Sequence, residues 1–282
     1  MQEMPNSSIT IFSYGDDMIN CLNSLDLMPD PKAYPIHAHE LAEINYLISG
    51  KGSYLVEGTT YTLSRKDVLL VRPAEIHKLQ ISPEEPYHRI AVQFSVELFD
   101  VIDPGRRLLR PLFDRGLGQN NLFPAGEYPR LQQAFSDFVL TPGLERVQLF
   151  SRILTFFTEL ATYYPSLPAA GGSSPNFSLQ LVAYVNDHLF EDLSLSKLGE
   201  VFYRSTSQIA RVFRQATGTS LWEYVLLKRL LAAREKIRCG QNASDACDTC
   251  GFSDYSAFYR IYKKHFGNSP SADKSAALNG RK

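Results

Sequence analysis

The stretch from Ser194 to Phe266 contains one pattern twice, as LSKLGEVFYRSTSQIARVFRQATG at residues 195–218 and as ASDACDTCGFSDYSAFYRIYKKHFG at residues 243–267. Each copy has a short apolar segment, a break, and a second segment whose apolar residues recur at helical spacing. Each copy ends in a glycine, which is a common residue just after a helix. The pattern predicts two helix-turn-helix units, at 195–217 and 243–266.

The second helix predicted in each copy has one apolar face and one polar face. Ile209 and Phe213 mark the apolar face in the first copy, and Phe258 and Tyr262 mark it in the second. The opposite faces carry Ser, Gln, Tyr, Arg and Lys, which suit the base edges of a major groove or the neutralisation of phosphates. The expected base contacts come from Arg211 and Arg260 with Ser207, Gln208, Tyr255 and Ser256, and the expected phosphate contacts come from Arg214, Lys263 and Lys264.

The segment between the two copies, SLWEYVLLKRLLAAREKIRCG (220–240), is an uninterrupted helical pattern. About 18 residues at ~1.5 Å each give a helix of about 27 Å. Such a helix would hold two recognition helices near one turn of DNA apart, about 34 Å. We therefore expect double-stranded operator DNA to be the partner of this part of the chain.

A set of residues in this stretch carries a resemblance to a known family. The set comprises Leu198, Phe213, Thr217–Gly218, Tyr224, Arg229–Leu230, Ala233, Gly251–Phe252, Ser256, Phe258, Arg260, Lys263–Lys264, Gly267 and Pro270. It resembles the C-terminal DNA-binding domain of the AraC/XylS family of bacterial transcription regulators. The sequence departs from the family pattern at Ala210, at Cys247 and Cys250, and at Asp273–Lys274. A helical bundle without a nucleic-acid role is the alternative, and the doubled pattern argues against it.

The charge of the chain is distributed unevenly along its 282 residues. Residues 177–282 hold 15 Lys and Arg against 10 Asp and Glu, and residues 1–176 hold 14 against 20, so net charges of +5 and −6 make up the total of −1. A basic part beside an acidic part is typical of a nucleic-acid-binding module joined to a module of another kind. The length allows one or two domains.

The composition indicates a cytoplasmic protein. No run of 18 apolar residues is present, and the first residues, MQEMPNSSIT, lack the regions of a secretory signal. Four cysteines in a chain of this length do not indicate a disulfide framework. Cys247 and Cys250 form a Cys-x-x-Cys motif, which could be a redox switch or half of a metal site. Because no second Cys or His pair lies at a suitable spacing, we favour simple packing.

The N-terminal part consists of short β-type runs from Pro35 onward. EINYLISG, GSYLVEG, TTYTL, DVLLVRP and HRIAVQFS are separated by turn residues. Short strands at close spacing predict an antiparallel barrel or a double-sheet jelly roll. The expected fold class is therefore a multidomain α+β chain. Its expected parts are an effector-binding barrel (1–105), a helical segment (106–165), a linker (166–176) and the DNA-binding domain (177–282).

His37, His39 and Glu43 lie at even spacing on the barrel sequence, which places them on one face of a strand. These residues resemble the first cupin motif, and His77 in the run Arg72-Pro-Ala-Glu-Ile-His77 resembles the histidine of the second. The second motif lacks the usual glycine before His77, and Lys66 stands where another glycine is usual. AraC-type regulators often carry such a cupin-like barrel as their effector domain, so the two resemblances agree.

Two roles are open for His37, His39, Glu43 and His77. Three imidazoles and a carboxylate suit a divalent Zn, Ni, Mn or Fe ion in an open site. Alternatively, the same side chains hydrogen-bond an effector or one another, with Tyr54, Arg72 and Gln93 as further effector candidates. The family resemblance implies a sugar or a sugar derivative as the effector. No cofactor is required by this reading.

The segment 106–165 predicts helices, including one at 144–164 that is apolar over a wide arc. We favour pairing of this helix between two chains as a homodimer interface, and its burial on the barrel is the alternative. The segment PSLPAAGGSSPN (165–176) is rich in Pro, Gly and Ser and predicts the interdomain linker.

These features together predict a ligand-responsive, sequence-specific transcription regulator of carbohydrate-utilisation genes that is not an enzyme. If it activates transcription, RNA polymerase is a further partner. One alternative is a metal-dependent cupin enzyme with a helical appendage. The other is a constitutive DNA-binding protein whose barrel serves only to dimerise the chain.

Overall fold

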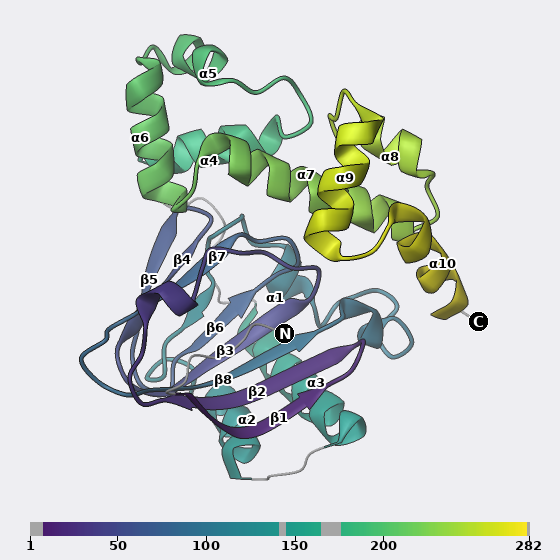
Figure 1. The fold of residues 1–282 in the computed structure, drawn as a ribbon. Coiled ribbons are helices and arrows are strands. Elements are labelled where there is room, and N and C mark those ends of the chain that lie inside the picture. The colour runs from purple at the N-terminus through teal and green to yellow at the C-terminus, as the bar shows by residue number, and fades with distance from the viewer. Residues whose placement is uncertain (1–7, 141–144, 165–175, 281–282) are drawn as a thin grey trace. The chain divides into compact units, whose positions relative to one another are not determined.

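The computed structural model describes residues 8–140, 145–164 and 176–280, and the chain divides into two compact units, 1–175 and 176–282 (Figure 1). The first unit is built on antiparallel strands and the second on helices, so the expected fold class is confirmed. The expected linker lies outside the described residues except for Asn176. None of the helices in the described ranges is long and apolar enough to cross a membrane.

Two antiparallel sheets form the first unit, with strand orders β1-β2-β8-β3-β6-β9 and β5-β4-β7 (Figure 1). Side chains of both sheets, such as Val71 of the larger and Val56 of the smaller, share one buried cluster, so the sheets face each other. The strands are β1 (Ser8–Gly15), β2 (Ile19–Asp26), β3 (Ala42–Ser49), β4 (Gly52–Val56), β5 (Thr59–Leu63), β6 (Val68–Val71), β7 (His77–Ile81), β8 (Tyr87–Phe94) and β9 (Leu122–Phe123), with short 3-10 turns at Pro31–Ala33 and Val96–Phe99.

Strand β3 is buried on both of its faces. Ile44 and Tyr46 belong to the apolar cluster on the helix side of the larger sheet, whereas Leu47 belongs to the cluster between the sheets. Because side chains alternate along a strand, Glu43 and Asn45 share the inward face with Leu47. A carboxylate and an amide are therefore placed inside the barrel, each 3% exposed.

The helices α1 (Arg110–Phe113), α2 (Pro129–Leu140) and α3 (Arg146–Tyr163) supply the rest of the cluster on the helix side. Helix α3 is the one expected to pair two chains. Its apolar arc packs against its own sheet and against α2, because Leu149, Ile153, Phe156, Phe157 and Leu160 are fully buried. The apolar arc is thus explained within one chain, as the alternative interpretation of the sequence held.

The two positions where the cupin pattern lacks its usual glycines adopt left-handed backbone. Lys66 has φ +70° and Ala74 has φ +60°. The Ala74 amide donates to the His39 carbonyl at 2.8 Å, which ties the loop of the second motif to the first. Lys66 and Ala74 therefore adopt the positive φ that glycine favours, at the conformational cost that a Cβ adds there.

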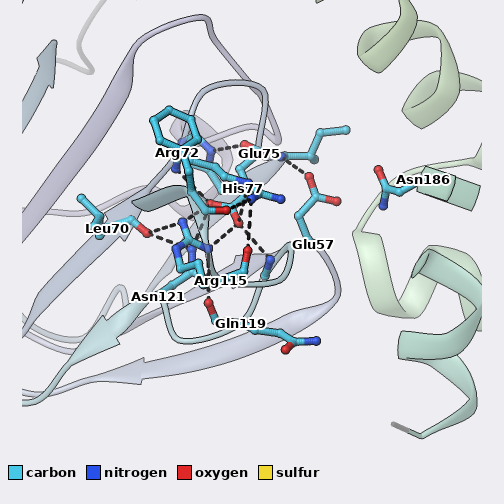
Figure 2. Close-up of polar contacts among 12 residues, drawn as sticks. Glu57, Leu70, Arg72, Glu75, His77, Arg115, Gln119, Asn121 and Asn186 are labelled. Atoms are coloured by element: carbon cyan, nitrogen blue, oxygen red, sulfur yellow. Dashed lines mark hydrogen bonds and ion pairs between the residues drawn. The ribbon is translucent and has the colours of Figure 1, made fainter. Parts of the chain in front are cut away.

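One end of the barrel is held by the buried carboxylate of Glu75, which Figure 2 shows facing Arg115 and Asn121. The Arg115 guanidinium donates to both Glu75 oxygens at 2.7 Å, and the Asn121 amide donates at 3.0 Å. The backbone amides of Gly118 and Arg72 add bonds of 2.9 and 3.0 Å. Burial alone would raise the pKa of Glu75, but the charge of Arg115 and the hydrogen bonds from Arg115, Gly118 and Arg72 together outweigh it and lower that pKa to about 2.

The second unit is built on the long helix α7 (Leu221–Arg238), with α6 (Thr206–Thr217) and α9 (Tyr255–Phe266) beside it (Figure 1). Both α6 and α9 begin at side-chain caps, since Ser205 accepts from the Gln208 amide and Asp254 from the Ala257 amide. The remaining helices are α4 (Phe177–Asp187), α5 (Leu195–Phe202), α8 (Ala243–Thr249) and α10 (Pro270–Gly280).

Arg229 on α7 joins the segment that follows α4 to the turn that precedes α9. Its guanidinium donates to the Leu189 carbonyl at 2.8 Å and to the Gly251 carbonyl at 2.6 Å. Asp273, one of the departures from the family pattern, is 4% exposed and accepts from Arg234 and Tyr262, both at 2.8 Å. The Asp273 carboxylate thus ties α10 to α7 and α9.

The low pKa of Glu75 predicts a specific loss of stability in acid. A carboxyl group whose pKa falls from 4.5 to about 2 on folding contributes about 3 kcal/mol above pH 4.5, and this contribution disappears as the pH falls towards 2. The wild-type advantage in unfolding free energy over Glu75→Gln should therefore shrink by about 3 kcal/mol between about pH 6 and pH 2. Urea unfolding of the full chain measures this difference. Glu84→Gln at an exposed position is the control, and a pH-independent advantage over Glu75→Gln would contradict the assignment.

Candidate effector site and nucleic-acid interface

Four side chains predicted as a site from the sequence converge inside the first unit. Glu43 comes from β3 and His77 from β7, and His37 pairs with His77 through backbone hydrogen bonds of 3.0 and 2.9 Å. The imidazole centroids lie 4.3 Å apart for His37 and His77 and 5.2 Å apart for His39 and His77. One ligand atom from each of the four residues lies within 4.8 Å of the others. The four residues that the sequence predicts as one site therefore lie together in the structure.

Each of the three imidazoles is held by its Nδ1 atom. His37 Nδ1 lies 3.0 Å from the Pro35 carbonyl, His39 Nδ1 lies 2.8 Å from the Leu41 carbonyl, and His77 Nδ1 lies 2.9 Å from the Glu75 carbonyl. Because a carbonyl oxygen only accepts, each Nδ1 carries the proton. In the neutral rings of His37 and His77 the Nε2 atom then presents a lone pair, whereas the Nε2 atom of His39 faces Glu43. This backbone anchoring is typical of histidines that bind metal ions.

Glu43 is the acceptor at the centre of the cluster. Its Oε2 lies 2.6 Å from His39 Nε2 and 3.6 Å from His77 Nε2. The first contact is a short hydrogen bond that requires a proton on His39 Nε2, and the second is too long for a hydrogen bond. Burial would raise the pKa of Glu43, but the bond from His39 and the nearby imidazoles outweigh it and hold that pKa well below its usual range.

The imidazoles respond differently to this environment. Burial lowers the pKa of His37 to about 4, and the neighbouring His77 adds to this effect. Burial acts in the same direction on His77, but the Glu43 carboxylate outweighs it and raises the pKa of His77. Titratable groups whose pKa values are pushed apart in a small volume are typical of functional sites.

A chain of polar side chains continues from Glu43 across the barrel interior. Gln93 donates to Glu43 Oε2 at 3.0 Å, and Asn45 donates to Oε1 at 2.7 Å. Tyr54 donates to the Asn45 side-chain oxygen at 2.7 Å, and Arg89 donates to the Tyr54 hydroxyl at 3.0 Å. The candidates Tyr54 and Gln93 therefore belong with the cluster. The sequence analysis missed Asn45 and Arg89, although each lies an even number of residues from a candidate on its own strand.

Arg72, another effector candidate, does not join this cluster. Leu69 and Val71 of β6 point between the sheets, so the alternation of the strand directs Arg72 away from the interior. Its guanidinium donates instead to the carbonyls of Phe113 and Arg115, at 3.4 and 3.2 Å. Arg72 is therefore part of the structure around Glu75 and is withdrawn as an effector contact.

The cluster fits a divalent metal ion. Three imidazole Nε2 atoms and a carboxylate are ligands suited to Zn, Ni, Mn or Fe once the proton between His39 and Glu43 is released. The Nε2 atom of His77 is buried without a hydrogen-bond partner, although buried polar atoms are generally paired. An ion held by His37, His39, Glu43 and His77 would provide that partner and replace the proton between His39 and Glu43.

In the second unit, the polar residues predicted to contact DNA lie on the faces of α6 and α9 that do not pack in the core. Ile209 and Phe213 of α6 and Phe258 and Tyr262 of α9 are fully buried, as expected. The predicted contact residues are exposed, apart from the partly buried Gln208: Ser207, Arg211, Arg214, Tyr255, Ser256, Arg260, Lys263 and Lys264.

The two recognition helices border one cleft of about 580 Å³. Ala210 and Arg214 line it from α6, and Ala257 and Ile261 line it from α9. Trp222 of α7 lies between them on the same cleft and is 67% exposed. Arg214 is the one predicted DNA-contact residue among the side chains that line this cleft.

The Cys247-x-x-Cys250 pair packs beneath α9. Both thiols are buried and free, and they belong to the apolar cluster that contains Phe258 and Tyr262. Burial raises the pKa of each thiol, so neither favours the reactive thiolate. The packing interpretation accounts for both cysteines.

Comparison with known proteins finds a family match within each unit. The family model described as an AraC-like ligand binding domain matches residues 27–139, and a helix-turn-helix domain model matches residues 198–275. The chain is 27% identical over 255 residues to the HTH-type transcriptional activator RhaS of Enterobacter sp. (strain 638), covering 84% of this chain and 86% of the relative. The RhaS of Citrobacter koseri is 24% identical over 88% of this chain and 95% of its own length.

Among solved structures, ToxT from Vibrio cholerae covers 93% of this chain and 98% of its own, at 10% identity and a TM-score of 0.40. A probable AraC family transcriptional regulator from Rhodopseudomonas palustris covers 36% of this chain and 98% of its own, at 24% identity and a TM-score of 0.33.

The fit of the His/Glu cluster to a metal predicts about one divalent ion per chain after dialysis against Zn, Ni, Mn or Fe(II), measured by elemental analysis. His77→Ala and Glu43→Gln should lose the ion, because each removes one ligand. His88→Ala is the matched control, since His88 bonds to Asn23 and lies outside the cluster. A wild-type chain that retains no ion from any of the four would show that the cluster binds only protons or an effector.

Proposed function

The chain joins an AraC-like ligand binding domain to a helix-turn-helix domain, as AraC-type transcription regulators do, and we propose that it binds operator DNA in response to a small molecule held in its barrel. The main support is the presence in one chain of a barrel interior lined by convergent polar groups and of two exposed basic recognition helices. Effector binding would favour one of two states of the chain, with a coupling free energy of about 1–3 kcal/mol.

The proposed effector is a polyhydroxylated molecule, a sugar or a sugar derivative. Glu43 and Asn45 offer acceptor oxygens to hydroxyl groups, and Gln93 offers an amide. Tyr54 supplies a hydroxyl and an aromatic ring on the opposite sheet. These groups suit a ligand whose hydroxyls both donate and accept, and genes for carbohydrate utilisation are accordingly the proposed targets.

The relatives are described as transcriptional activators. We extend that role to this chain as part of the proposal, with RNA polymerase as a partner and the cytoplasm as the location where it meets DNA. The homodimer remains part of the proposal, although the buried arc of α3 no longer argues for it. No enzymatic activity is proposed, because effector binding accounts for the polar cluster and DNA binding accounts for the basic helices.

Arg260 is proposed to read a base. Arg260→Ala should weaken binding to a selected operator duplex by about 1–3 kcal/mol and relax the sequence preference at one position. Fluorescence anisotropy with selected and scrambled duplexes measures both effects. Lys51→Ala, which removes an exposed cation from the first unit, is the control. Equal losses on both duplexes would reduce Arg260 to a phosphate contact.

Lys264 is proposed to neutralise a phosphate. Lys264→Ala should weaken binding to selected and scrambled duplexes alike, because phosphates carry no sequence information. The slope of log affinity against log salt should flatten by about one unit. The same anisotropy titrations, repeated over a range of salt concentrations, give this slope. An unchanged slope would remove Lys264 from the interface.

A further inference from the structure

Arg89 projects into the barrel interior from β8. Ile90, Val92 and Phe94 of the same strand pack on the helix side of the larger sheet. Arg89 therefore shares the inward face with Gln93. Its Nη1 donates to the Tyr54 hydroxyl on the opposite sheet at 3.0 Å, and the guanidinium lies 5.1 Å from the centroid of the Tyr34 ring.

Among the described residues no carboxylate lies in ion-pair contact with the Arg89 guanidinium, and Glu43 acts on its charge only from a distance. Its contacts are the Tyr54 hydroxyl and the Tyr34 ring, and its buried Nε has no hydrogen-bond partner. Asp26 accepts from the Tyr34 hydroxyl at 3.4 Å. Glu43 is reached only through Tyr54 and Asn45. A cation partly withdrawn from water without a counter-charge is costly, so the site favours an anion.

Arg115 in the same unit shows what a structural arginine looks like here. Its guanidinium meets both oxygens of Glu75 at 2.7 Å and also bonds to Asn121 and the Leu70 carbonyl. The Nε atoms of both arginines are without a hydrogen-bond partner, but the Arg89 guanidinium meets no carboxylate among the described residues, and its Nη1 donates to the Tyr54 hydroxyl. The Nε side of a guanidinium is one of the edges that pair with two oxygens of an oxyanion.

From these contacts we infer that the effector of this barrel is an anion, a polyhydroxylated molecule whose oxyanion binds Arg89 while its hydroxyls face Gln93, Asn45 and Glu43. This inference rests on the proposed function, since it assigns a chemical class to the ligand of the same site. A sugar acid and a sugar phosphate share the required chemistry, and a neutral sugar lacks it.

The first test compares full-length chains without ligand. Arg89→Met should leave the melting temperature unchanged or raise it, because it removes a buried cation that no carboxylate in the described part of the barrel contacts. Arg115→Met should lower the melting temperature clearly, because it leaves Glu75 buried and unpaired. A fall with Arg89→Met as large as with Arg115→Met would overturn the inference by making Arg89 a structural residue.

The second test adds galacturonate, glucose 6-phosphate or galactose at matched ionic strength. At least one of the two anions should raise the wild-type melting temperature more than galactose does, and the rise should disappear in Arg89→Met. The carboxylate and phosphate arms distinguish the two sources of the oxyanion. An equal or larger rise with galactose, a rise that persists in Arg89→Met, or no rise with either anion would count against an anionic effector.

DNA binding separates this inference from the proposed function. Binding of the wild-type chain to the selected operator duplex in the absence of effector measures the proposed function without reference to the ligand of the barrel. If the wild-type chain binds no duplex, the proposed function fails whatever the barrel holds. If the duplex is bound and the melting experiments give the contrary result, only the anionic effector is excluded.

Discussion

The barrel interior is organised around the carboxylate of Glu43. A buried carboxylate costs several kcal/mol unless its oxygens are paired, and both oxygens of Glu43 are occupied, by Asn45 on one side and by His39 and Gln93 on the other. Glu43 lies inside the larger sheet, on a strand buried on both faces, so water does not reach its carboxylate. The polar side chains of the interior are those that satisfy it.

The pairing of Glu43 also divides the interior into two ends. At one end lie the imidazoles, whose Nδ1 atoms are committed to backbone carbonyls and whose Nε2 atoms are available to a proton or a metal ion. At the other end lies Arg89, reached through Asn45 and Tyr54. A ligand that pairs with Arg89 would act on the same hydrogen-bonded chain that carries Glu43, so the two ends share one network.

In the second unit, single polar side chains determine how the helices are held together. Arg229 bonds to carbonyls that follow α4 and that belong to the turn before α9, so one side chain connects segments on either side of α7. Asp273 performs a similar role for α10. These buried contacts hold the helices in place. The exposed faces of α6 and α9 are therefore free to carry polar and basic side chains.

The sequence by itself determined the elements whose signal is local. The helical spacing of Ile209 and Phe213, the capping residues before α6 and α9, and the even spacing of His37, His39 and Glu43 each depend on neighbours a few residues away. Tertiary structure alone decided which faces meet. Only the strand register brings Arg89 to Tyr54 and sends Arg72 to the other side, and only packing shows that the apolar arc of α3 is buried in its own unit. These outcomes depend on contacts between distant segments, which the period of a sequence does not encode.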